Sequence, residues 1–271
     1  DGNIDDNLTT TKAHIYSIVG EYFVTISGTF PKFVMENELR LLSFVSAGTN
    51  DSVINGENSW SNCTNLQTFN SSGLTMVSEC KSAWLGCTGL TEFDTSGLTM
   101  VDNCNQAWSG CTSLTTFDSS GLTMVDTCSN AWQECSGLKT FDSSGLIKAT
   151  DCTQSWFNCK GLTTFDTSGM NMVTMCMNAW NVCEGLTDFD TSGLIEVLDC
   201  ENAWKGCSSL KTFDSSGLVK VTTCLGAWVE TPDYNIPLNT FTFSPISGMV
   251  LPTATGWMTA FFINSPPSQS P

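Results

Sequence analysis

Tryptophan recurs every 24 residues along most of this chain. The positions are Trp60, Trp84, Trp108, Trp132, Trp156, Trp180, Trp204 and Trp228. The residues between them repeat as well, so the period belongs to a whole structural unit. A fixed period of this length is typical of a solenoid, in which each repeat buries its apolar face only against its neighbours. The period therefore predicts one elongated repeat solenoid with coils of 24 residues.

The second half of each repeat has an apolar spacing that predicts a helix. In one copy Val101, Cys104, Trp108 and Cys111 are separated by three, four and three residues. This spacing places the four side chains on one face of an α-helix. We therefore expect coils of mixed α/β type.

The first half of each repeat predicts a short strand and a turn. The segment 90–93 is short, rich in Thr and bounded by turn residues, which favours a strand that stacks on its copies. The segment 94–97, Asp-Thr-Ser-Gly, predicts a turn, because Asp and Ser bond nearby amides and Gly tolerates unusual backbone angles. Equivalent residues should then form ladders along the solenoid. One ladder comprises Phe69, Phe93, Phe117, Phe141, Phe165, Phe189 and Phe213.

The Trp ladder has two interpretations. Exposed, it could stack on carbohydrate rings; buried, it would be core. Because Trp108 shares its expected helical face with Val101 and Cys104, we expect the Trp and Phe ladders to be structural core.

The ends of the chain lack the repeat and divide it into three parts. We expect an N-terminal β-rich cap over 1–57, a solenoid of about seven repeats over 58–230, and an irregular C-terminal cap with a Pro/Ser-rich tail over 231–271. Alternation from Tyr22 to Ser27 predicts a hairpin in the first cap. Solenoids need such caps to cover their end coils.

These residues resemble the BspA-like leucine-rich-repeat group of bacterial surface proteins. The matching copy runs from Leu114 through Phe117, Asp118 and Trp132 to Leu138, in the pattern Leu-Thr-x-Phe-Asp … Ala-Trp-x-x-Cys-x-x-Leu. The Ala-Trp-x-x-Cys form is similar to a variant found in proteins of marine tailed phages. The resemblance spans about 13–230. It implies a leucine-rich-repeat-like fold and a surface or virion protein, and it supplies no catalytic residues.

The fourteen cysteines fall into two columns of seven. They are Cys63, Cys87, Cys111, Cys135, Cys159, Cys183 and Cys207, and Cys80, Cys104, Cys128, Cys152, Cys176, Cys200 and Cys224. Disulfides between residues seventeen apart, from Cys63–Cys80 to Cys207–Cys224, would leave none unpaired. Buried free thiols are the other interpretation, and we prefer it because free Cys packs as a small hydrophobe. The lack of Cys-x-x-Cys and the single histidine argue against a zinc site.

A column of aspartates raises the question of a metal. It comprises Asp94, Asp118, Asp142, Asp166, Asp190 and Asp214. Carboxylates about 5 Å apart repel each other, so a Ca²⁺ column between coils is one interpretation. The other is that each Asp caps its own turn, which Asn70 could do in the first copy without charge. We prefer the turn and expect no metal and no cofactor.

Charge and composition exclude several classes of function. The formal charge is −17 with only ten Lys and Arg, which argues against nucleic-acid and anionic-membrane partners. No apolar run is long enough to span a bilayer. His14 is the only histidine, and no nucleophile or phosphate-loop motif is present, so we do not expect an enzyme. A regular ice-binding Thr face is interrupted by Glu92 and Asp188.

We therefore expect a non-enzymatic protein on a virion or cell surface. The leading interpretation is a phage adhesin or decoration protein that binds polysaccharide or protein of a host surface. The alternatives are a secreted bacterial adhesin and a subunit that self-assembles through its caps. Candidate contact residues, chosen because they vary between copies, are Lys81, Gln106, Gln133, Asn158, Asn181 and Lys205.

Overall fold

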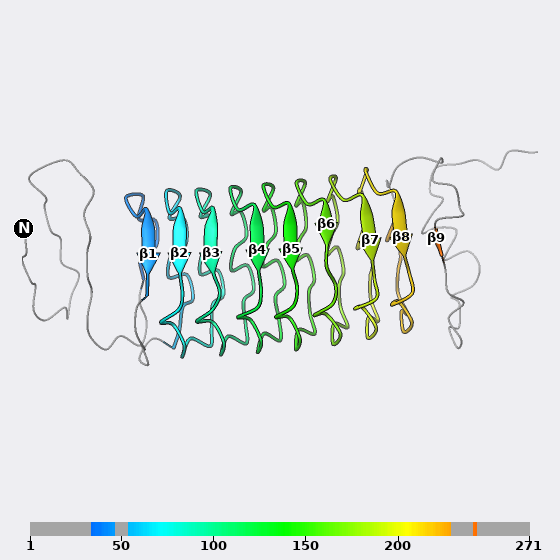
Figure 1. Cartoon of the computed structure of the whole chain (residues 1–271), viewed down its shortest axis with the longest axis horizontal. Helices are drawn as coiled ribbons and strands as arrows, with labels where there is room; N and C mark the ends of the chain where they lie inside the picture. Colours follow the sequence, from blue (N-terminus) through cyan, green and yellow to red (C-terminus); the bar gives the residue numbers. More distant parts are fainter. Residues whose placement is uncertain (1–33, 47–53, 229–240, 243–271) are drawn as a thin grey trace, which may run out of the picture.

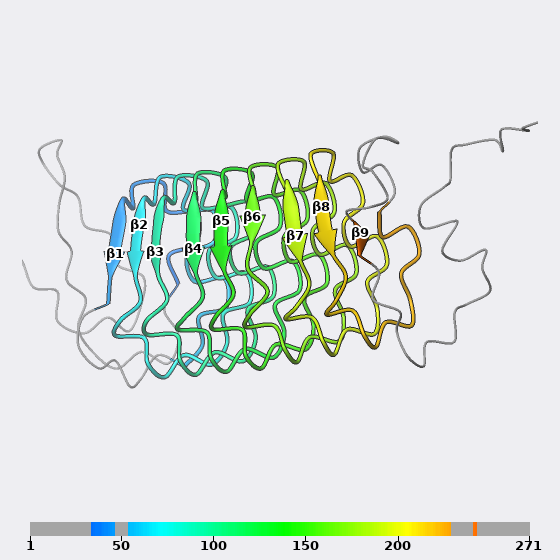
Figure 2. The same ribbon diagram turned by 45° about the vertical axis from the view of Figure 1, so that its right-hand side comes forward.

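The repeats form a stack of coils that are wound side by side. The structure, a computed structural model, describes residues 34–46, 54–228 and, as backbone, 241–242. Within them the chain is a β-solenoid of about seven coils, each about 24 residues long (Figure 1). Each coil adds one strand to a wall of parallel strands, and Figure 2 shows the rest of each coil closing behind that wall. The expected solenoid is confirmed, although its coils differ from the α/β type.

The strands of the wall are short and in register. They are β1 (Ser43–Val45), β2 (Thr68–Asn70), β3 (Glu92–Asp94), β4 (Thr116–Asp118), β5 (Thr140–Asp142), β6 (Thr164–Phe165), β7 (Asp188–Asp190), β8 (Thr212–Asp214) and β9 (Phe241–Thr242). All pairs are parallel, with Phe69 opposite Phe93 and Phe117 opposite Phe141. Because successive strand residues face opposite sides, every Phe points inward while its neighbours point out.

The ladder of strand hydrogen bonds is interrupted between β3 and β4 and between β6 and β7. At both places a threonine hydroxyl spans the two coils: Thr95 Oγ1 donates to Asp118 O, and Thr167 Oγ1 donates to Asp190 O, each at 3.1 Å. The Phe rings on either side remain stacked across both interruptions, with centroids 5.9 Å apart. The interruptions therefore divide the ladder but not the core.

The expected helix is absent, and a series of turns replaces it. Over 80–87 some backbone N–H groups donate within their own coil, and others donate to the next coil. Ala83 and Cys87 donate to carbonyls three residues back, at Cys80 and Trp84, as in β-turns. Cys80 and Trp84 donate instead to the next coil, at Asn103 O and Ala107 O. An α-helix would use all of these amides internally. The helical prediction was wrong because hydrogen bonds between stacked coils replace those within a helix.

Two columns of left-handed residues make these turns possible. The first contains Asn58, Ser82, Gln106, Asn130, Gln154, Asn178 and Asn202, with φ between 53° and 58°. The second contains Asn62, Gly86, Gly110, Glu134, Asn158, Val182 and Gly206, with φ between 57° and 75°. Gly and Asn adopt this conformation most easily. Their recurrence four residues apart is the sequence signal that distinguishes these turns from a helix.

A second line of parallel contacts runs along another side of the stack. Single bridges join the equivalent residues Asn55, Glu79, Asn103, Thr127, Asp151, Met175, Asp199 and Thr223 from coil to coil. Each coil is therefore joined to its neighbours along the wall of strands, along this line and through the turn amides.

The described residues extend the stack beyond the Trp repeats. β1 pairs with β2, and Met35 N–H donates to Ser59 O, so residues 35–46 continue the stack at one end. At the other end β9 pairs with β8. The hairpin expected from the alternation at 22–27 and most of the C-terminal cap lie outside the described residues. No helix in the described part of the chain could cross a membrane.

Candidate binding faces

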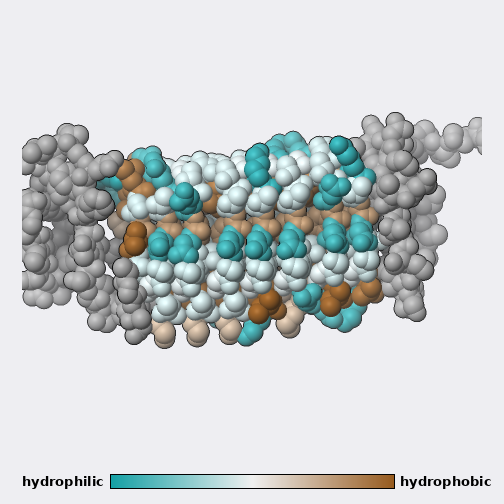
Figure 3. All heavy atoms as spheres, viewed as in Figure 1, coloured by the Kyte–Doolittle hydropathy of each residue, from teal (hydrophilic) through white to brown (hydrophobic). Residues whose placement is uncertain are grey.

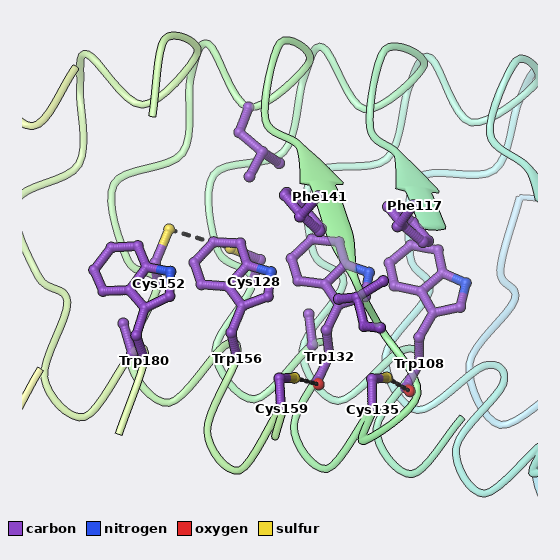
Figure 4. Close-up of a cluster of buried hydrophobic side chains, with 14 of the residues drawn as sticks. Trp108, Phe117, Cys128, Trp132, Cys135, Phe141, Cys152, Trp156, Cys159 and Trp180 are labelled. Carbon is purple, nitrogen blue, oxygen red and sulfur yellow. Dashed lines mark hydrogen bonds between the residues drawn. The ribbon is translucent and has the colours of Figure 1, made fainter. Parts of the chain in front are cut away.

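The aromatic ladders form the centre of the solenoid. The eight Trp side chains of the repeat are at most 2% exposed. Neighbouring indoles are stacked with centroids 5.2–5.6 Å apart. Each Phe packs edge-on against the Trp of two coils. The ring centroid of Phe117 lies 4.8 Å from that of Trp108 and 5.1 Å from that of Trp132 (Figure 4). Edge-to-face and offset stacking are the favoured aromatic arrangements. These rings are therefore unavailable for stacking on a sugar.

The indole N–H groups are further signs of a structural role. For Trp84, Trp108, Trp132, Trp156, Trp180 and Trp204, no hydrogen-bond acceptor lies within reach in the described coils. Leaving a buried donor unpaired is costly. We infer that the area and stacking of the aromatic column outweigh this cost.

The first cysteine column supplies hydrogen-bond donors to the core. The Cys135 thiol donates to Trp108 O and the Cys159 thiol to Trp132 O, each at 3.1 Å (Figure 4). The same contact joins Cys87 to Trp60 O at 3.0 Å. Each of these carbonyls belongs to the preceding coil, so a free thiol joins two coils. Burial raises the pKa of the Cys135 thiol to about 12, because a thiolate there would lose its solvation.

The second cysteine column lies on a different part of each coil. Its members are buried, and in one pair the two sulfurs lie close together: Cys128 Sγ is 3.3 Å from Cys152 Sγ, one coil further on (Figure 4). Burial also raises the pKa of Cys104 well above the usual range of a thiol. All fourteen cysteines are free. The alternative of bridges between residues seventeen apart is not what the structure contains.

The aspartate column occupies the ends of the strands and binds the backbone. Asp142 Oδ1 accepts the Ser144 N–H at 2.8 Å, and Asp118 Oδ1 accepts the Ser120 N–H at the same distance. The other four aspartates make the same bond two residues on. This is the Asx-turn geometry. Among the described residues no group of acidic, Cys or His side chains is arranged to hold a metal ion.

A ladder of buried hydroxyls behind these turns was missed by the sequence analysis. Ser119 Oγ accepts the Gly145 N–H at 3.0 Å, and Thr95 Oγ1 accepts the Gly121 N–H at 3.1 Å. A Cβ at Gly145 would overlap Ser119 O. The Gly is therefore required by the close approach of two coils, and the constant Ser/Thr-x-Gly spacing was the available signal.

The outer face of the strand wall is polar and regular. It presents three rows along the stack: the Thr-rich row at the start of each strand, the Asp row at its end, and a row of serines two residues later. The serines are Ser72, Ser96, Ser120, Ser144, Ser168, Ser192 and Ser216, all exposed. Figure 3 shows the hydrophilic row that follows the strand ends. We call these three rows the strand face.

The six variable positions that the sequence analysis chose do not form one surface. They fall on four different positions of the coil, and the helix on which they were placed is absent. Lys81 and Gln106 are exposed, whereas Asn181 is only 7% exposed. Variation between copies was a poor guide to exposure because turn residues vary with backbone conformation as well as with function.

Neither a known protein family nor a curated protein sequence matches the chain. Similar solved structures include a leucine-rich repeat protein of T. pallidum, with 15% identity, 76% of this chain and 87% of that chain covered, and a TM-score of 0.42. A leucine-rich repeat protein from Bacteroides ovatus has 13% identity and a TM-score of 0.29, and the match covers 79% of this chain and 92% of that chain. A leucine rich cell surface protein from Faecalibacterium prausnitzii has 15% identity and a TM-score of 0.21, and the match covers 86% of this chain and 89% of that chain. At identities this low, nothing that these proteins bind is carried over to this chain.

Proposed function

We propose that this chain is a non-enzymatic surface protein that binds the surface of a host cell through its strand face. The main support is that the inner and outer sides of each coil carry different kinds of side chain. Aromatic, thiol and aliphatic side chains are used in the core, while the outer rows are polar throughout: Thr with Glu92 and Asp188 in the first row, Asp with Asn70 in the second, and Ser in the third. A straight array of hydrogen-bonding groups suits a repetitive polymer such as a polysaccharide.

The setting of this role is also proposed. The sequence resemblance favours display on the virion of a tailed phage, as an adhesin or a decoration protein. A secreted bacterial adhesin would use the same face. A cell wall or membrane anchor encoded with the chain would favour the bacterial protein, whereas co-purification with phage particles would favour the virion.

The role can be tested by binding of the fluorescently labelled full chain to intact bacterial cells. We expect saturable binding to some strains and competition by their purified surface polysaccharide. Absence of binding to every strain from the source habitat would contradict the proposal and favour a self-assembling subunit.

The face can be tested with matched variants. The double substitution Asp118→Asn and Asp142→Asn changes the strand face while keeping its turns, because Asn70 makes the same turn through its Oδ1. We expect it to weaken binding to cells by about tenfold. The control is Asp102→Asn and Asp126→Asn, which removes charge from another side of the coil and should leave binding unchanged. Equal effects of the two variants would show that charge, not the strand face, governs binding.

A further inference from the structure

A row of exposed apolar side chains runs along one corner of the coils. It comprises Met76, Met100, Met124, Ile147, Met172, Ile195 and Val219, which are 38–50% exposed. Each coil contributes one member. We call these residues the turn-tip row; Figure 3 shows hydrophobic residues along the lower edge of the stack, with hydrophilic residues between some of them.

Six of the seven residues of the turn-tip row, all except Val219, occupy the centres of hydrogen-bonded β-turns, where apolar residues are not expected. In one coil Val101 N–H donates to Leu98 O at 3.2 Å, and in another Ala149 N–H donates to Leu146 O at 3.1 Å. Gly, Asn, Asp, Ser and Pro dominate the centres of such turns. Neither the turn nor the core requires an exposed Met there.

Each coil keeps its apolar tip even where the sequence changes. Where the second central position carries Lys148, Glu196 or Lys220, the first becomes Ile147, Ile195 or Val219. Where the second position is Met, the first is Thr or Asn. The row shifts by one residue at the three coils that carry Ile or Val, and Lys148 Nζ lies 3.0 Å from Met124 Sδ. Single exposed apolar residues need no explanation, but one in every coil is typical of an interaction site.

Carboxylates lie on both sides of the turn-tip row in four of the seven coils, on the preceding side alone in two, and on the following side alone in the first. Before it comes the Asp row of the strand face, from Asp94 to Asp214. After it come Glu79, Asp102, Asp126, Asp151 and Asp199. Within this strip, in the described coils, positive charge comes only from Lys148 and Lys220, and Lys220 is paired with Glu196. The strip is therefore an apolar line within a strongly negative field.

We propose that the turn-tip row is a docking surface for a basic amphipathic helix of a partner protein. The apolar stripe of such a helix would cover the Met, Ile and Val tips, and its Lys and Arg would face the two acidic borders. Four of the seven tips are Met, whose flexible side chain adapts to varied partners. The apolar tips lie outside the strand face, and the two surfaces share the Asp row between them.

The repeat of the row matches the pitch of a helix. Coils about 4.8 Å apart bring successive tips close to the 5.4 Å rise of a helical turn, and seven tips span about 29 Å. A helix of about 20 residues has that length. Two copies of this chain would bring like charges together at their acidic borders, and an anionic membrane would be repelled in the same way. Charge therefore favours a basic partner.

The test uses a labelled peptide of about 20 residues made of Leu and Lys, with the Leu in one helical stripe. Its control is a peptide of the same composition in scrambled order. We expect the striped peptide to bind the full chain at least about tenfold more tightly than the scrambled one, as measured by fluorescence anisotropy. Added salt should weaken binding, because the borders are charged.

A quadruple variant locates the site: Met76→Gln, Met100→Gln, Met124→Gln and Met172→Gln. The turn tolerates polar residues here, as Lys148 and Glu196 show, and circular dichroism verifies folding. We expect striped-peptide affinity to fall about tenfold, whereas Thr116→Gln, Thr140→Gln and Thr164→Gln on the strand face should leave it unchanged. Equal binding of the striped and scrambled peptides, wild-type affinity of the Met variant, or no binding would each overturn the proposal. So would Met-dependent dimers in sedimentation or Met-dependent binding to anionic vesicles without binding to the peptide.

Discussion

At the residue scale, the spacing of the coils depends on glycines that touch the backbone of the preceding coil. A Cβ at Gly145 would overlap the Ser119 carbonyl, which cannot move aside as a side-chain end could. We expect Gly145→Ala to lower the free energy of unfolding by about 3 kcal/mol or more. The measurement is urea unfolding followed by Trp fluorescence.

Gly110→Ala is the control for this substitution. Gly110 has a φ of 75°, but the nearest atom to its added Cβ is Gly86 Cα, at an ordinary 3.6 Å. We therefore expect Gly110→Ala to lower the free energy of unfolding by about 1–2 kcal/mol, through its left-handed backbone conformation alone. If both variants lost the same free energy of unfolding, contact between coils would not be the reason for glycine at position 145.

Val182 carries local strain that substitution should relieve. Its φ is 61°, a conformation that a β-branched residue rarely adopts. Gly86, Gly110 and Gly206 occupy the same position in other coils. We expect Val182→Gly to raise the free energy of unfolding by about 1 kcal/mol. A lower melting temperature for this variant would contradict the strain.

At the element scale, the Asp of each strand end acts through its turn. Asp142→Ala loses the acceptor for the Ser144 N–H and should cost about 1 kcal/mol. Asp142→Asn keeps an acceptor and removes one charge beside Asp118, its strand partner, so we expect no loss of stability. Equal losses in the two variants, measured by urea unfolding, would show that charge rather than the turn matters.

The same turns bear on metal binding. The carboxylates already accept backbone N–H groups, and we expect neither a chelator nor added Ca²⁺ to change the melting temperature. Ca²⁺ that binds the folded chain would raise it by mass action. A rise abolished by substituting the Asp column with Asn would therefore contradict the turn interpretation.

The difference between turns and a helix also shows what the sequence could predict at this scale. The 24-residue period, the strand at each Phe and the Asx turn follow from local patterns. The expected helix was wrong, because inward positions such as Val101, Cys104 and Cys111 have a spacing that fits a helix and also fits this series of turns. The deciding factor is where the alternate amides donate, and that depends on the neighbouring coil.

At the scale of the whole molecule, the buried thiols predict how stability depends on pH. Burial raises the pKa of Cys87, Cys135 and Cys207 to about 12, from an unfolded value near 9. Between these values the unfolded state has lost protons that the folded state keeps. Stability is thus fully present below pH 9 and falls as pH rises, by about 1.4 kcal/mol per unit for each thiol.

We therefore expect steep alkaline unfolding in circular dichroism and Trp fluorescence. Because many thiols act together, the transition should begin soon above pH 9 and should be reversible in a reducing buffer. Stability that remains constant to pH 11 would contradict the burial of the thiol columns.

The surfaces were harder to predict than the core. The buried Trp column could be inferred from its repetition, and so could the exposed Asp of each turn. The turn-tip row could not, because its members alternate between two sequence positions, as Met124 and Ile147 do. They form one line only after folding places both positions on the same corner.

The account rests on one continuous core in which all fourteen cysteines are free thiols and the outer faces are left for binding. Mass spectrometry after alkylation tests this directly. Without reductant, the native chain should react at few or no cysteines, and the chain unfolded in urea should react at all fourteen. Unreactive cysteines in the unfolded chain would reveal disulfides. Extensive labelling of the native chain would show that the columns are not buried. Either result would contradict the account.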